Sequence, residues 1–120
     1  IISIQNPIRL NDYTEPQPDI AALRLRPDYY ASAHPTPADV LLVIEVAETS
    51  LPYDRDVKLP RYAEAQIPEV WLIDLAGATV TQYAQPRNGV YADVHPAQRG
   101  DVLIARTFAN VLVPVDDLVT

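Results

Sequence analysis

The stretch from Val40 to Ala47 constrains the fold more than any other part of the sequence. It is apolar at every position except Glu45. Side chains alternate between the two faces of a strand. A run that is apolar at both odd and even positions therefore predicts a strand covered on both faces, as in a parallel or mixed sheet. A helical pattern and a second apolar run, 69–75, follow it. Such a strand–helix–strand unit crosses over right-handed and makes the two strands parallel.

The connecting helix is predicted from about Asp54 to Ala65, with Asp54 as its N-cap. Pro60 lies within it and should kink the second turn, because proline removes a backbone hydrogen bond. The rest of the chain predicts short strands separated by turns, and one helical turn. These are an edge strand within 1–10, strands at 19–23, 79–84, 90–94 and 102–105, and a helical turn at 116–119. Together they predict an α/β fold with a mixed sheet, in a single domain over residues 1–120.

Composition excludes several classes of protein. The chain has no cysteine, which excludes disulfides and thiolate zinc sites. No apolar run approaches the roughly 20 residues of a membrane span, and no signal peptide is recognisable, so we expect a cytoplasmic protein. The net charge of −7 argues against tight nonspecific DNA binding by this chain alone. The chain also lacks methionine and starts IISIQ, so we expect it to be a trimmed piece of a longer protein.

Three charged residues together suggest a chemical site. Glu45 stands near the end of the central strand, where burying a carboxylate is costly. Asp19 opens another strand, and Lys58, in the following helix, is the single lysine of the chain. Two carboxylates from neighbouring strands, with the backbone carbonyl of Val46, would make a hard oxygen site for Mg²⁺ or Mn²⁺. A lysine beside them could stabilise charge on a phosphate, which is the chemistry of metal-assisted phosphodiester hydrolysis.

Each of these residues also has an ordinary structural interpretation. An aspartate after proline at a strand start is commonly a turn or cap residue, and a single lysine is commonly exposed. Glu45 could be a buried acid bonded to an arginine or to the backbone. We interpret Asp74 as a turn residue and Trp71 as core, and we expect His34 and His95 to be exposed.

Three segments carry a resemblance to a known family: PQPDIAAL, ADVLLVIEVAETS and YDRDVKLPRYAEAQIPEVWLIDL. They resemble the Uma-two family of the restriction-endonuclease-like superfamily, whose signature is PD-(D/E)xK, over about residues 4–84. The resemblance implies a mixed sheet flanked by helices and a divalent-metal nuclease site acting on DNA. It implies that Asp19 and Glu45 are the two acids of the signature. It also implies an N-terminal helical part that is absent from this chain.

The signature departs from its usual form at the lysine. That residue normally stands two positions after the second acid, where this chain has Ala47. The resemblance implies that the lysine has moved into the next helix, where Lys58 fits. It also shows Gln66 at a position where relatives often have glycine, which concerns the end of the helix and not the chemistry.

Two functions are therefore open. The first is an endonuclease with catalytic Asp19, Glu45 and Lys58. The second is a non-catalytic dimerisation or partner-binding module on the same fold, which the acidic charge, the altered signature and the missing N-terminal part favour. Under the second, Lys58 could lie more than ~10 Å from both acids, where a screened attraction is small. The first also predicts arginines near the site, drawn from Arg24, Arg26, Arg55 and Arg61.

Overall fold

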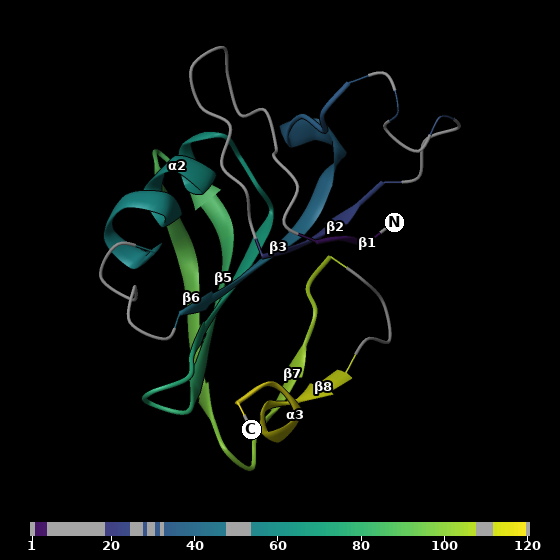
Figure 1. Ribbon diagram of the computed structural model, residues 1–120. Helices are drawn as coiled ribbons and strands as arrows, with labels where there is room; N and C mark the ends of the chain where they lie inside the picture. The colour runs from purple at the N-terminus through teal and green to yellow at the C-terminus, as the bar shows by residue number, and fades with distance from the viewer. Residues whose placement is uncertain are drawn as a thin grey trace.

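The computed structural model describes residues 2–4, 19–24, 28, 31, 33–47, 54–107 and 112–119. Within these ranges the main sheet has six strands in the order β1-β2-β3-β4-β5-β6, and β7 and β8 form a separate antiparallel pair (Figure 1). In the main sheet β3 and β4 are parallel, and the other neighbours are antiparallel. The strands are β1 (Ile2–Ile4), β2 (Ile20–Leu23), β3 (Val40–Ala47), β4 (Glu69–Asp74), β5 (Thr79–Arg87), β6 (Val90–Gln98), β7 (Val102–Ile104) and β8 (Leu112–Pro114). The predicted α/β fold with a mixed sheet is confirmed.

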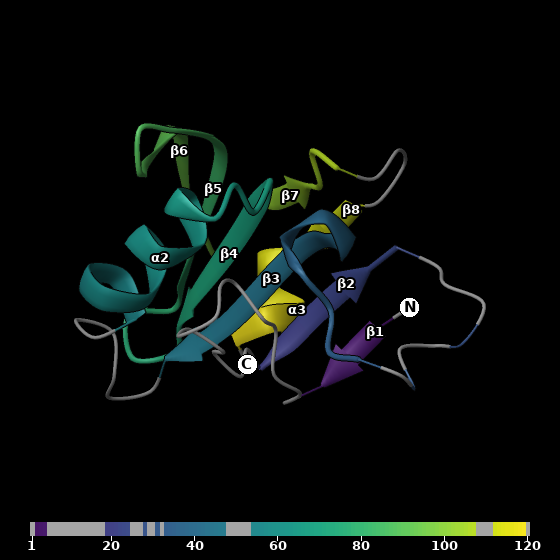
Figure 2. The same cartoon turned by 90° about the horizontal axis from the view of Figure 1, so that it is seen from above.

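Both faces of the sheet are covered, as the sequence predicts for β3. Helix α2 (Leu59–Glu64) packs on one face, and β7, β8 and α3 (Val115–Val119) pack on the other (Figures 1 and 2). Consecutive residues of β3 enter different cores: Val43 joins the α2 side and Leu42 the α3 side. The odd and even positions of β3 are both apolar because the strand lies between two covering layers and packs against apolar side chains on each face.

The predicted helix forms in two parts. Residues Asp54–Lys58 are π-helical (η2), and Leu59–Glu64 are α-helical. Pro60 stands in the first turn of α2, where a missing N–H is tolerated. In a continuous α-helix that N–H would bond to the carbonyl of residue 56, which proline cannot do. The predicted kink at Pro60 thus takes the form of a change from π to α geometry, and Lys58 lies at the junction.

Gln66, two residues after the end of α2, has an unusual backbone conformation. Its φ is 64°, in the left-handed region that glycine adopts most easily at this position after a helix. The chain then turns directly into β4, and Ile67 is fully buried in the α2-side core. The left-handed conformation therefore lets the chain reverse within two residues and return to the sheet.

The hairpin after β4 is longer than the sequence predicts. Strands β5 and β6 extend three and four residues beyond the predicted ends at 84 and 94. Asn88 and Gly89 connect them, with φ of 54° and 79°. Two consecutive positive φ angles give a turn whose twist matches the twist of paired strands. The predicted strand at 102–105 is β7, and the predicted helical turn at 116–119 is α3. Most of the predicted edge strand, including residues 5–10, lies outside the described residues.

Candidate active site

Strand pairing brings the two predicted acids together. In the antiparallel pair β2–β3, Ile20 is opposite Ile44, so Asp19, one residue earlier, comes opposite Glu45. Oδ2 of Asp19 accepts a hydrogen bond from the backbone N–H of Val46, at 2.7 Å. Ala21, two residues after Asp19, lies in the α2-side core. Because side chains alternate along a strand, Asp19 and Glu45 belong to the face of the sheet that α2 covers.

Each oxygen of the Glu45 carboxylate has its own donor. The side chain of Lys58 lies 3.2 Å from Oε2, and the hydroxyl of Tyr62 donates to Oε1 at 2.8 Å. Glu45 is only 3% exposed. The three predicted residues therefore lie together, and Lys58 is far closer than the ~10 Å at which a screened attraction becomes small. Among the described residues, the side-chain partners of Glu45 are a lysine and a tyrosine, and no bond to a described arginine is found.

The environment of Glu45 makes its charged form more costly than it is in water. Burial raises the pKa of Glu45 above its ordinary value, because a charged carboxylate loses its hydration there. The hydrogen bond from Tyr62 and the charge of Lys58 oppose this rise, and the nearby charge of Asp19 adds to it. Tyr62 and Lys58 therefore offset only part of the cost of burying the charge of Glu45.

The altered signature has a structural explanation. Ala47 is fully buried, and it lies on the same face of β3 as Val43 and Glu45. A lysine at position 47 would have to fit where the alanine side chain is already fully buried. Lys58 instead reaches the carboxylate of Glu45 from the helix above the sheet, with about a quarter of its side chain exposed.

The donor set is sparse for a metal ion. No group of three or more histidine, cysteine or acidic side chains that could hold a metal is found in the part of the chain that the structure describes. Asp19 and Glu45 would supply two carboxylates, and the third protein ligand would have to come from the backbone. Mg²⁺ commonly binds one or two carboxylates and keeps several waters. The residues present therefore fit a magnesium-like ion, and the carbonyl of Val46 as a ligand stays a prediction.

The predicted gathering of arginines is wrong for Arg24. Its Nε donates to the carbonyl of Ala38. This contact lies just past the far end of β2, whereas Asp19 stands just before the start of that strand. Arg61 is exposed on α2. Arg26 and the side chain of Arg55 lie outside the described residues. Short sequence distance from Asp19 misled the prediction, because a strand carries the chain away from its own start.

The other interpretations of single residues agree with the structure. Asp74 accepts a hydrogen bond from the N–H of Gly77 and so holds the turn after β4. Trp71 is buried, and His34 and His95 are exposed.

Sequence reasoning missed two features. The first is Tyr62, which the sequence does not single out. Its spacing of four residues from Lys58 is the signal that could have found it, since such residues share a helix face. Glu69 is the second. It is fully buried and bonded to Trp71, Gln82 and the backbone near Thr107. Glu69 is two residues before Trp71 on β4, so both side chains lie on the α3 side of the sheet, opposite the face that carries Glu45.

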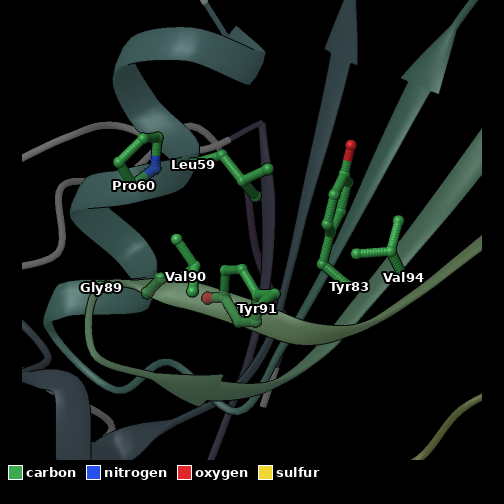
Figure 3. A pocket seen from close by; sticks show the side chains of 8 residues that line it. Leu59, Pro60, Tyr83, Gly89, Val90, Tyr91 and Val94 are labelled. Carbon is green, nitrogen blue, oxygen red and sulfur yellow. The ribbon is translucent and has the colours of Figure 1, made fainter.

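An apolar pocket lies beside this site, between α2 and the β5–β6 hairpin. It has a volume of about 210 Å³ and is lined by Leu59, Pro60, Ala63, Tyr83, Gly89, Val90, Tyr91 and Val94 (Figure 3). The hydroxyl of Tyr91 donates to the carbonyl of Ile67 at 2.8 Å. None of Asp19, Glu45 and Lys58 is among its lining residues. The pocket is therefore distinct from the charged site.

Comparisons with known proteins agree with this architecture. Residues 1–116 match the model of the Uma2 family, which is described as "Putative restriction endonuclease". The fold is similar to the crystal structure of a "putative nuclease belonging to DUF820" from Anabaena variabilis, with a TM-score of 0.66 and 14% sequence identity. The match covers 98% of this chain and 66% of that one, so this chain spans just under two thirds of its length.

No functionally curated protein matches the sequence. No helix in the described ranges is long and apolar enough to cross a membrane. The family match extends over nearly the whole chain, beyond residues 4–84, where the resemblance was recognised. The chain therefore belongs to the Uma2 family of putative restriction endonucleases.

Proposed function

We propose that this chain is a divalent-metal-dependent endonuclease that hydrolyses DNA phosphodiester bonds. Family membership supports nuclease activity. The observation that carries the site is the pairing of buried Glu45 with Lys58 at 3.2 Å, with Asp19 on the same face of the sheet. A buried ion pair adds little stability compared with apolar residues of similar volume. A pair kept beside a further carboxylate is therefore better explained by chemistry than by folding.

Asp19, Glu45 and the carbonyl of Val46 are the groups that we propose as ligands for Mg²⁺ or Mn²⁺. When bound, such an ion polarises a phosphoryl oxygen and lowers the pKa of a coordinated water. Lys58 stabilises the negative charge that develops on the phosphate during attack. Its compact ammonium suits this role because it can shift between the carboxylate of Glu45 and a phosphate without the fixed planar geometry of an arginine.

The alternative is a non-catalytic dimerisation or partner-binding module on the same fold. The net charge of −7 and the alanine at position 47 favour it. A lysine more than ~10 Å from both acids would have supported this alternative, but Lys58 lies 3.2 Å from the carboxylate of Glu45. We therefore prefer the enzyme. A homodimer and a cytoplasmic location remain predictions.

Calorimetric titration of Mn²⁺ tests the metal site. We expect a binding heat for the wild type and its loss in Glu45→Ala. Glu64→Ala is the matched control, because Glu64 is an exposed glutamate at the end of α2. It should bind as the wild type does. Equal, negligible heats for the wild type and Glu45→Ala would remove the metal claim.

Plasmid nicking tests the reaction. With Mg²⁺ or Mn²⁺ the wild type should relax supercoiled DNA, and EDTA should abolish the activity. Lys58→Met should slow nicking by about 10²-fold or more, the usual effect of losing one group that stabilises transition-state charge. The same variant should still bind Mn²⁺. Metal binding without nicking by the wild type would favour the interaction module.

A further inference from the structure

We infer that Tyr62 is a positioning residue for Glu45: its hydroxyl holds the plane of the carboxylate so that the oxygen it does not bond faces a cation. This inference rests on the proposed function for its catalytic meaning, although the orientation it describes can be measured without metal. Tyr62 is 1% exposed, and its hydroxyl donates to Oε1 at 2.8 Å. Oε2 faces the ammonium of Lys58. The two oxygens are thus divided between a neutral donor and a cation.

The helix provides this division through its spacing. Residues four apart lie on the same face of a helix, about 5–6 Å apart at Cβ. Lys58 ends the π-helical segment and Tyr62 lies in α2, so both reach the same carboxylate from above the sheet. Tyr62 lies deeper, within the α2-side core, whereas Lys58 is partly exposed. The phenol of Tyr62 therefore holds the oxygen on the core side, and the other oxygen faces the partly exposed ammonium of Lys58.

Packing makes the tyrosine an effective anchor. Its ring lies in the same core cluster as Val43 and Val70, so the position of its hydroxyl is held by side chains on two strands. A carboxylate rotates about its terminal torsion across a broad, shallow energy profile unless something holds it. A donor on a fixed ring removes that freedom. Without the hydroxyl, Oε2 would face the cation for a smaller fraction of the time.

A metal-free experiment tests the orientation. Urea unfolding midpoints are measured for the wild type, Lys58→Met, Tyr62→Phe and the double variant; phenylalanine keeps the ring in the core. If Tyr62 aims Oε2 at Lys58, then Lys58→Met shifts the midpoint less in the Tyr62→Phe background than in the wild type. An equal or larger shift would mean that the two donors act independently, and it would overturn the inference.

Tyr91→Phe is the matched control for this cycle. Tyr91 is also a buried tyrosine whose hydroxyl donates to one acceptor at 2.8 Å, but that acceptor is the carbonyl of Ile67. Its ring lines the apolar pocket (Figure 3). Lys58→Met should shift the midpoint equally with and without Tyr91→Phe, because Tyr91 bonds the carbonyl of Ile67 whereas Lys58 bonds the carboxylate of Glu45. A coupling of the same size in this control would show a general softening of the core, and it too would contradict the inference.

A second measurement uses metal. Mn²⁺ calorimetry should show affinity lowered about 10- to 100-fold in Tyr62→Phe, the usual cost of losing a group that orients a metal ligand. Tyr91→Phe should bind as tightly as the wild type. Unchanged affinity in Tyr62→Phe would overturn the positioning role at the metal. Absence of binding by the wild type would instead refute the proposed metal site, and the unfolding cycle would still decide whether Tyr62 orients Glu45.

Discussion

The substitution Glu69→Gln separates a structural carboxylate from the one proposed to act in catalysis. Glu69 is fully buried, on the side of the sheet away from Glu45. In the described part of the chain, Oε1 accepts from the N–H groups of Arg106 and Thr107 and from the hydroxyl of Thr107, at 2.9–3.0 Å. Oε2 accepts from the side chains of Trp71 and Gln82, both at 2.7 Å. The carboxylate thus ties the start of β4 to β5 and to the segment after β7.

Glutamine has the same shape but only one accepting oxygen. If its oxygen takes the place of Oε1, its NH₂ faces the donors of Trp71 and Gln82. If the amide is reversed, the NH₂ faces the N–H groups of Arg106 and Thr107. Gln82 cannot relieve the conflict by turning its own amide, because the same nitrogen also donates to the carbonyl of Ile104. Either orientation leaves at least two buried or partly buried donors without an acceptor.

Each unsatisfied buried donor costs about 1–3 kcal/mol, so the unfolding free energy should fall by about 2–6 kcal/mol. For a domain of this size that corresponds to a melting temperature lower by roughly 8–24 °C, at about 4 °C per kcal/mol. Urea and thermal unfolding, followed by circular dichroism, measure it. Glu64→Gln makes the same chemical change at an exposed site and should stay within ~0.5 kcal/mol of the wild type.

The functional readout completes this experiment. Below its melting temperature, Glu69→Gln should bind Mn²⁺ with wild-type affinity, because Glu69 lies on the other face of the sheet. A loss of stability under about 1 kcal/mol would refute the bonding argument. A loss of Mn²⁺ affinity in folded protein would show that the two carboxylates are not separate in function.

Other substitutions test single features. Glu45→Gln removes the titration of a buried acid. The pKa of Glu45 in the folded protein lies above the unfolded value of about 4.5. The contribution of Glu45 to stability is therefore present in acid and is lost as pH rises through the folded pKa. The unfolding free energy of the wild type minus that of Glu45→Gln should therefore fall from pH 4.5 upward in urea titrations at several pH values, and a difference that rises would contradict the raised pKa. Asp19→Asn should abolish Mn²⁺ binding but cost little stability, since an amide oxygen can still accept from the N–H of Val46; a large drop in melting temperature would show a mainly structural role. Gln66→Gly should raise the unfolding free energy by about 0.5–1 kcal/mol, because glycine adopts the left-handed conformation without the ~1–2 kcal/mol cost of a side chain; chemical denaturation would reveal an unchanged or lower value if that conformation carries no strain.

Much of the fold could be predicted from local patterns. The apolar run in β3 and the turn at Asn88–Gly89 reflect short-range requirements of strand burial and backbone geometry, which neighbouring residues express directly. Strand ends were less predictable. Strands β5 and β6 continue past Ala84 and Val94 because each supplies hydrogen bonds to the other. The strand propensity of a segment does not indicate how far the strand paired with it extends.

The sequence by itself determined the mixed sheet, the crossover helix and the candidate trio of Asp19, Glu45 and Lys58. Only the tertiary structure decided the contacts among these residues and the partners that sequence reasoning missed. Strand pairing places Asp19 opposite Glu45, and the first turn of α2, which follows the change from π to α geometry after Lys58, brings Tyr62 onto the same carboxylate. A hydrogen bond across elements depends on angstrom-scale placement of two backbones, which residue types and spacing alone do not specify.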